Sequence, residues 1–307
     1  MTYPPGLIFF VQYIFPPIIL IAGLYGNAMG FVVLLNKDLI NIGPRDTYMY
    51  LFLIDTFYLL QIIITNLQYS YHLDLSIVSD FLCKTYSFFN YSMATISPWL
   101  IVYITFDRFI SIHYPAKRFN LRKPSVQLIW FLFVFAVCQV YYLPVILYQE
   151  IIYTNTTLKN QTNEIARVCN FDNILHGLII SYMDLLLRVL APFFLMVVLS
   201  ILLSMSLFAS RTRIVENFLA EENRTFYKEI RLVVSSICMN LVYMFLQLPV
   251  SITVFNSIYY SNFTFYFSFY LFYLSYAINF YIILPTNSLF RKKFFELYRC
   301  LKKKTKN

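Results

Sequence analysis

The pattern of hydrophobic positions divides the chain into seven long apolar runs separated by short polar segments. Each run is long enough to cross a hydrocarbon core of about 30 Å as an α-helix. We therefore predict an all-α membrane protein, a seven-transmembrane helix bundle forming a single domain over residues 1–307. The predicted spans lie at about 7–35, 47–70, 81–112, 125–148, 177–209, 232–257 and 263–285.

A short amphipathic helix is predicted after the last span, at about residues 287–301. Phe290, Phe294 and Leu297 recur there at helical spacing, and basic residues occupy the opposite face. We expect this helix to lie in the membrane interface with its basic face toward anionic lipid. Cys300, near its end, is either a palmitoylation site or an unmodified thiol.

Composition supports a membrane protein. Hydrophobic residues make up 59% of the chain and charged residues 13%, whereas a soluble domain carries about a quarter charged residues. The mean hydropathy is +0.63. The net charge of +9 does not indicate nucleic-acid binding, because the basic residues lie in the gaps between apolar runs and not on one face of a soluble fold.

The basic residues also predict the orientation. Most of the 24 Lys and Arg residues follow the first, third, fifth and seventh runs, and the opposite loops hold only Lys159 and Arg167, with Lys84 near the boundary. The positive-inside rule then places the carboxyl terminus in the cytoplasm and the amino terminus outside the cell, in the plasma membrane. The outer loop after span four carries sequons at Asn155 and Asn160, which we expect to be glycosylated.

Polar residues inside membrane helices are costly, so they are candidates for function. Asp107-Arg108-Phe109 resembles the DRY triplet of the rhodopsin-like (class A) G-protein-coupled receptors, and Cys83 lies 25 residues before Arg108, as in that family. The other helices carry residues similar to the family's markers, namely Asn27, Asp55, Trp130, Pro192, Pro249 and Asn279. The resemblance extends over the whole chain.

The resemblance implies a disulfide between Cys83, at the outer end of the third span, and Cys169, in the long outer loop. Both positions are expected to face oxidising surroundings. Such a bond would fix the loop over the mouth of the helix bundle.

The resemblance also implies coupling to a heterotrimeric G protein through Arg108. A lone Arg at a helix end is often only an interface residue, but Asp107 directly precedes this one. Glu229 lies where the family places a second acidic partner, and an Arg108–Glu229 ion pair would join the third and sixth helices at rest. The alternative is that Glu229 is a solvated loop charge.

Asp55 lies at the middle of a span, where an unpaired carboxylate is costly. Ser97, Ser275 and Asn279 fall at the family positions that surround a sodium ion together with this carboxylate. The alternative is a hydrogen-bonded Asp packed against Asn27 and Asn279. No other cofactor is expected.

The expected ligand pocket is rich in aromatic residues. Asn90 stands where amine receptors carry an Asp, and Tyr273 stands where opsins carry the retinal lysine, so neither ligand class is indicated. Asp184 and Arg188 lie on one face of the fifth helix, where they either neutralise each other or anchor a polar ligand. The long outer loop resembles those of peptide receptors, which favours an extracellular neuropeptide. A small chemosensory ligand is the alternative.

Several positions depart from the family pattern. Gln247, another expected pocket residue, stands where Trp is usual, and Tyr243 where Phe is usual. The remaining departures are Phe280 for Pro, Ile283 and Ser200 for Tyr, and Pro98 for a branched aliphatic residue. They imply that the contacts made on activation differ from the usual ones.

Two other classes of membrane protein are weaker interpretations. A transporter or channel would favour internal repeats and more ionisable residues inside the spans. An intramembrane enzyme would need a metal-ligand or nucleophile–base set. The three histidines, His72, His113 and His176, lie at span ends and form no such pattern, so no enzymatic activity is expected.

Overall fold

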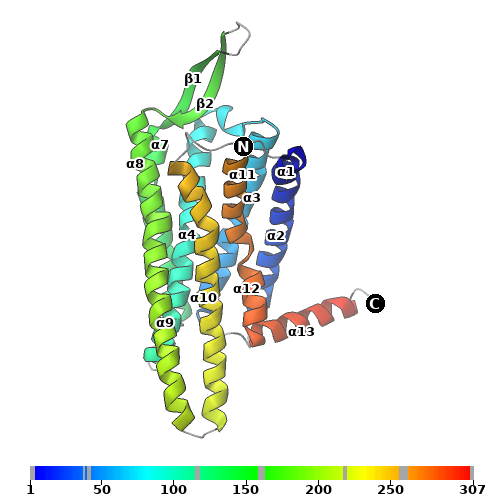
Figure 1. Cartoon of the computed structure of the whole chain (residues 1–307), viewed down its shortest axis with the longest axis vertical. Coiled ribbons are helices and arrows are strands. Elements are labelled where there is room, and N and C mark those ends of the chain that lie inside the picture. Colours follow the sequence, from blue (N-terminus) through cyan, green and yellow to red (C-terminus); the bar gives the residue numbers. More distant parts are fainter. Residues whose placement is uncertain are drawn as a thin grey trace.

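The computed structural model describes the backbone of residues 4–36, 39, 43–114, 118–157, 163–216, 220–255 and 262–304. Among these residues, the side chains of 118–119, 154–157, 163–166, 207–216, 220–229, 254–255, 262 and 300–304 are outside the described part. The helices pack side by side into one elongated bundle (Figure 1).

Seven helical spans make up the described bundle. They are α1, η1 and α2 (Pro5–Phe9, Phe10–Ile14, Phe15–Leu34); α3 (Arg45–Ser70); α4 (Asp80–His113); α6 and α7 (Pro124–Tyr141, Leu143–Tyr148); α8, η4 and α9 (Ile174–Asp184, Leu185–Leu190, Ala191–Glu216); α10 (Ala220–Phe255); and α11 and α12 (Asn262–Ala277, Asn279–Thr286). The prediction of an all-α seven-helix bundle is confirmed. α9 and α10 extend furthest beyond the predicted apolar runs.

The spans differ in how apolar they are. Five of the described helical rods are long and apolar enough to cross a membrane alone, and the bent pair α11–α12 adds a sixth. α4 is not among them, although it is 34 residues long. It packs against α3, α6, α9 and α10, so much of its surface contacts protein instead of lipid. A central helix can therefore carry more polar residues than its neighbours.

A two-stranded hairpin is the part of the fold that the hydrophobic pattern did not predict. β1 (Gln149–Thr157) pairs antiparallel with β2 (Asn163–Phe171), with Ile151 opposite Cys169. The hairpin projects from the end of the bundle where α1 begins (Figure 1). Cys169 forms the expected disulfide with Cys83 of α4, with Cα atoms 5.6 Å apart. We call this end of the bundle the hairpin end.

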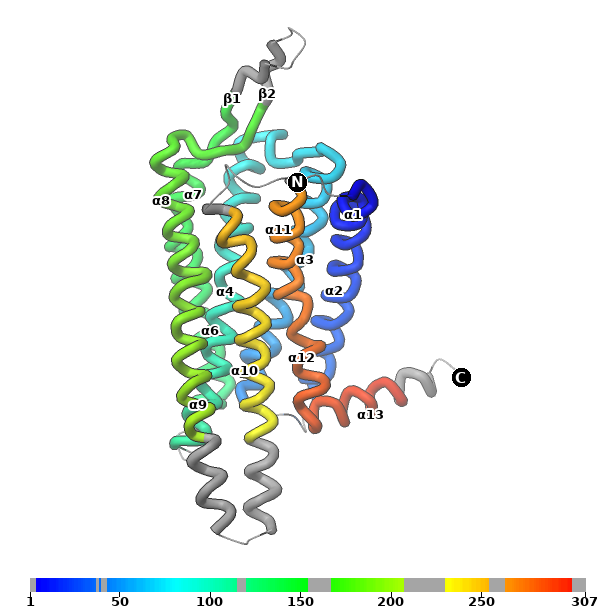
Figure 2. The backbone as a smooth tube through the Cα atoms, in the orientation of Figure 1, coloured from blue at the N-terminus to red at the C-terminus, as the bar shows by residue number. Residues whose placement is uncertain are grey.

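The last helix, α13 (Ser288–Lys304), leaves the opposite end of the bundle and runs across its axis (Figure 2). The Asn287 side chain caps it by accepting hydrogen bonds from the backbone amides of Leu289 and Phe290, both at 3.1 Å. Phe290 and Phe294 pack edge-on against Phe280 of α12. The predicted amphipathic helix is therefore present and is anchored by its aromatic face.

Candidate functional site

A small cavity lies in the half of the bundle nearer the hairpin. Its volume is about 100 Å³, and Asn90, Asp184 and Arg188 contribute to its lining, as the sequence predicted. Tyr58, Tyr91, Ser181, Val250, Phe269 and Phe272 complete it. The other two predicted pocket residues, Gln247 and Tyr273, are buried and are not among the lining residues.

The two charges in this cavity are paired with each other. Arg188 Nη2 lies 2.6 Å from Asp184 Oδ2, across the junction of α8 and η4. The Tyr142 hydroxyl donates to Asp184 Oδ1 at 2.9 Å, and the Arg188 guanidinium lies 4.8 Å from the centre of the Phe272 ring. Buried charges require such partners. Of the two predicted interpretations, the geometry favours mutual neutralisation.

A layer of aromatic side chains lies beneath the cavity. Tyr58 donates to Asn90 Oδ1 at 3.0 Å and packs against Tyr273 and Tyr276, with ring centres 5.3 and 4.4 Å away. The Tyr273 hydroxyl is hydrogen-bonded to Thr65 at 2.8 Å. Tyr273 therefore has a structural role, because its hydrogen bond to Thr65 joins α11 to α3.

Asp55 forms a second polar cluster, at the middle of the bundle. Asn279 donates to Asp55 Oδ2 at 2.7 Å, and Ser97 lies beside the carboxylate. Asp55 Oδ1, Ser97 Oγ and Asn27 Oδ1 are buried and have no hydrogen-bond partner within the described part of the chain. Ser275, the fourth predicted ligand, instead donates to the Phe272 carbonyl at 2.7 Å and accepts from Gln247 at 3.0 Å.

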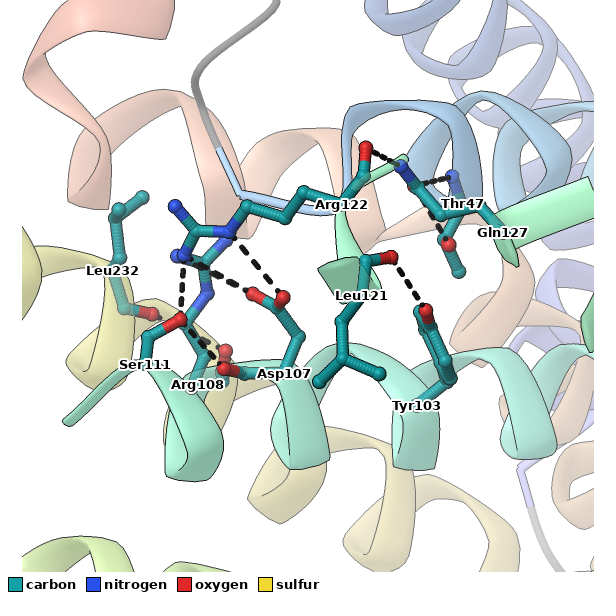
Figure 3. A network of polar contacts seen from close by, with 10 residues as sticks. Thr47, Tyr103, Asp107, Arg108, Ser111, Leu121, Arg122, Gln127 and Leu232 are labelled. Carbon is teal, nitrogen blue, oxygen red and sulfur yellow. Dashed lines mark hydrogen bonds and ion pairs between the residues drawn. The ribbon is translucent and has the colours of Figure 1, made fainter. Parts of the chain in front are cut away.

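The third cluster surrounds Asp107 and Arg108 at the end of α4 away from the hairpin. Both side chains are completely buried, and Arg108 Nη1 lies 3.9 Å from Asp107 Oδ2. Asp107 lies closer to Arg122, whose Nε and Nη2 each donate to a carboxylate oxygen at 3.3 Å. Arg122 also donates to the Ser111 hydroxyl at 2.6 Å (Figure 3). The carboxylate therefore has two basic partners, of which sequence analysis identified only Arg108.

Arg122 is in turn connected to α3. Gln127 of α6 donates to the Arg122 carbonyl at 2.9 Å, and its amide oxygen accepts from the Thr47 backbone amide at 2.9 Å and from the Thr47 hydroxyl at 3.1 Å (Figure 3). One polar network thus spans α3, α4 and α6. No motif predicted it, because Thr47 lies 80 residues from Gln127 in the sequence and the members are ordinary in type.

Comparison with known proteins settles the family. Residues 8–284 match the model for the 7 transmembrane receptor (rhodopsin family). The chain belongs to the rhodopsin family of seven-transmembrane receptors. No curated protein matches this receptor. The resemblance seen in the motifs is thereby confirmed for nearly the whole chain.

The departures from the family pattern have their own partners in this receptor. Ser200 accepts a hydrogen bond from Asn240 at 3.0 Å, and Asn240 Oδ1 accepts from Thr105 at 3.1 Å. These contacts join α9, α10 and α4. Asn240 is completely buried. It is a functional candidate that the search for family motifs missed, although a buried Asn in an apolar span was the available signal.

The seventh span of the receptor bends by 46° between α11 and α12 even though Phe280 replaces the expected proline. Asn27 donates to the Tyr276 carbonyl at 3.2 Å. In a regular helix that carbonyl would accept the amide of residue 280. The Asn27 side chain thus supplies a partner at the bend, while Phe280 and Ile283 pack in the core.

Four predicted residues lie outside the described side chains of the receptor. They are Glu229 in α10, Cys300 in α13, Asn155 in β1 and Asn160 between the strands. The Arg108–Glu229 ion pair, palmitoylation and glycosylation accordingly stay predictions.

Proposed function

We propose that this receptor binds an extracellular ligand, a neuropeptide in our preferred assignment, and activates a heterotrimeric G protein. The observation that carries the proposal is that α4 lines the cavity with Asn90 and carries buried Arg108 at its other end. A ligand that favours a second arrangement of α4 and α10 would open a cleft at Arg108 by shifting the population of that state. The role is therefore signalling, with no catalytic step.

The cavity limits how a peptide would bind. About 100 Å³ accommodates only a side chain or a terminal group, so most of a peptide would lie across the hairpin end. Tyr153 and Arg167 on the hairpin, with Arg167 5.8 Å above the Tyr153 ring, offer it aromatic and cationic contacts. A small chemosensory molecule would instead fill the cavity alone.

Membrane lipid is the second proposed partner, at α13. Phe290 and Phe294 anchor the helix to the bundle, while Arg291 and Lys292 are exposed. We propose that these basic residues contact anionic headgroups of the inner leaflet and that Cys300 is palmitoylated. Mass spectrometry of the receptor isolated from cells tests the acylation directly.

An allosteric sodium ion is proposed at Asp55. The buried oxygens of Asp55, Ser97 and Asn27 that lack hydrogen-bond partners within the described part of the chain suit a hard cation. Asn279 binds the Asp55 carboxylate, whereas Ser275 would have to leave Phe272 and Gln247 to reach the ion. If the ion binds, replacing choline chloride by sodium chloride should raise the Tm of the purified receptor by a few degrees. Asp55→Asn should abolish this shift. An equal shift in the variant would contradict the sodium site.

The main test is a screen of cell-surface receptor against a neuropeptide library, with nucleotide exchange on a G protein as the readout. Arg108→Ala should lower exchange about tenfold or more, on the scale of ordinary allosteric coupling. Lys123→Ala, which removes an exposed basic side chain at the same end of the bundle, is the matched control. Normal exchange in Arg108→Ala at equal surface expression would refute the mechanism.

A further inference from the structure

The chain before α3 contacts Arg108 directly. A Cβ atom added at Gly43 would lie 2.5 Å from Cζ and 2.7 Å from Nη1 of the Arg108 guanidinium. Such distances are far inside van der Waals contact, so the backbone of Gly43 leaves no room for a side chain beside the charged group. Gly43 has a φ of 61°, which is the left-handed region that residues with a side chain seldom adopt. Only glycine meets both requirements here.

The next residues enclose the guanidinium further. Gly43 is followed by Pro44, whose carbonyl accepts the Tyr48 amide at 3.1 Å in the first turn of α3. The Tyr48 hydroxyl lies close to both Arg108 and Ser236 of α10. Tyr48 and Ser236 are buried. We call residues 43–48, which comprise Gly43, Pro44 and the first turn of α3, the 43–48 turn. It contacts Arg108 from the α3 side of the bundle.

A chain of hydrogen bonds and an ion pair also connects the 43–48 turn to Asp107. Thr47 is bound twice by Gln127, which binds the Arg122 carbonyl, and Arg122 binds the Asp107 carboxylate. Asp107 is the covalent neighbour and ionic partner of Arg108. The contacts thus form a closed ring through α3, α6 and α4. Arg108 cannot move out of the end of the bundle away from the hairpin unless the 43–48 turn moves too or the guanidinium loses its contact with that turn.

We propose that Gly43 and Tyr48 are positioning residues that hold Arg108 in its resting orientation, and that activation requires the guanidinium to leave the 43–48 turn. This inference rests on the proposed G-protein coupling for its functional meaning. Its structural part, a specific contact between the turn and Arg108, does not. The resting state is then fixed by the loop before α3 as well as by any contact of Arg108 with α10.

Two consequences separate a positioning role from a general structural one. Gly43→Ala should displace the guanidinium and raise agonist-free nucleotide exchange about fivefold. Tyr48→Phe, which keeps the buried ring and removes only the hydroxyl, should raise it in the same direction by less. A purely structural role would lower surface expression and exchange together.

A double-mutant cycle on the full-length receptor in lipid nanodiscs tests the contact itself, with Tm as the readout. Gly43→Ala in an otherwise unchanged receptor combines backbone strain with overlap on Arg108, whereas in the Arg108→Ala background only the strain is left. We expect the Tm loss from Gly43→Ala to shrink by about 2–4 °C in that background. The matched control is Gly30→Ala, where a Cβ would meet the Phe52 ring at 2.6 Å and where the three nearest atoms all belong to Phe52 and none to Arg108. Its Tm loss should be the same in both backgrounds.

The outcomes are distinguishable. Equal Tm losses from Gly43→Ala in the two backgrounds would overturn the inference, and if that variant does not fold, the same cycle with Tyr48→Phe decides. Non-additive Tm values with raised exchange would support it. Suppose that the Tm values are non-additive and that exchange falls in Arg108→Ala but is unchanged in Gly43→Ala. That result would overturn the proposal that the 43–48 turn holds Arg108 in its resting orientation. Absence of exchange in every form, with non-additive Tm values, would count against G-protein coupling and support the positioning contact.

Discussion

At the scale of single residues, the charges buried at the end of α4 are balanced by a residue from outside that helix. Asp107 and Arg108 are completely buried, and Arg122 is 13% exposed. A buried carboxylate costs several kcal/mol unless charged partners and hydrogen bonds offset the lost hydration. Arg122 supplies two of these hydrogen bonds and an ionic partner. The loop after α4 therefore stabilises the charge state at its end.

Arg122→Ala should consequently destabilise the receptor by about 3–5 kcal/mol, because it removes one partner from a buried charge. Thermal unfolding of the purified receptor measures the loss. In an Asp107→Asn background, Arg122→Ala should cost less stability, since the carboxylate that Arg122 binds is then absent. If the two substitutions were simply additive, Arg122 would not be the partner that matters.

Gln247 gives a second prediction at this scale. The residue is 1% exposed and donates to Ser275 at 3.0 Å, so the space around it is already filled. Gln247→Trp, which introduces the residue usual in the family, should overpack the core and cost about 1–3 kcal/mol. The same assay measures it, with the exposed Phe245→Trp as control. A receptor stabilised by Trp at position 247 would contradict the packing described.

Some of these residues could be predicted from sequence and others could not. Asp55 with Asn279, and Asp184 with Arg188, stand out because a polar side chain in an apolar span needs a partner. Arg122 and Gly43 lie in short polar segments and Gln127 at the start of a predicted span, where Arg, Gly and Gln are ordinary. Their importance depends on which segments meet in space, and a single sequence does not contain that information.

At the scale of secondary-structure elements, the helices follow directly from hydropathy, but the breaks and the hairpin do not. The bend between α11 and α12 depends on Asn27, some 250 residues earlier in the chain. β1 and β2 lack a strict alternation of polar and apolar residues, because the hairpin extends away from the bundle (Figure 1) and packs on it only at its base, where Gln149 is buried and Phe171 contacts the core. Local pattern predicts an element only where burial imposes that pattern.

The bend yields a prediction of its own. Asn27→Leu would leave the Tyr276 carbonyl without its side-chain donor in a buried place, which should cost about 1–3 kcal/mol. Asn66→Leu is the matched control, because it also removes an amide donor to a backbone carbonyl, that of Gln12, but at a part-buried position. It removes a longer hydrogen bond to the Tyr270 hydroxyl as well. Thermal unfolding should therefore show the larger loss for Asn27→Leu. Equal losses would mean that the donor at the bend has no special role.

At the scale of the whole molecule, two independent physical arguments predict the orientation in the membrane. The Cys83–Cys169 disulfide lies at the hairpin end, and disulfides persist in oxidising compartments. Arg122, Lys123 and the basic face of α13 lie at the other end, and positively charged loops favour the cytoplasmic side. Each argument alone predicts that the hairpin lies outside and α13 inside the cell. In the proposed mechanism, this orientation puts the cavity on the extracellular side and Arg108 on the side that faces the G protein.

Epitope tags at the two termini measure this orientation. We expect an amino-terminal tag to be stained on intact cells and a carboxyl-terminal tag only after permeabilisation, because α1 and α13 lie at opposite ends of the bundle (Figure 2). Asn155→Gln combined with Asn160→Gln should lower the apparent mass by removing outer-loop glycans. Asn223→Gln should not, because its sequon, Asn223-Arg224-Thr225, lies at the start of α10, at the end of the bundle expected to face the cytoplasm. The reverse staining would place the disulfide in a reducing compartment and Arg108 outside the cell, and would exclude the proposed coupling whatever the ligand.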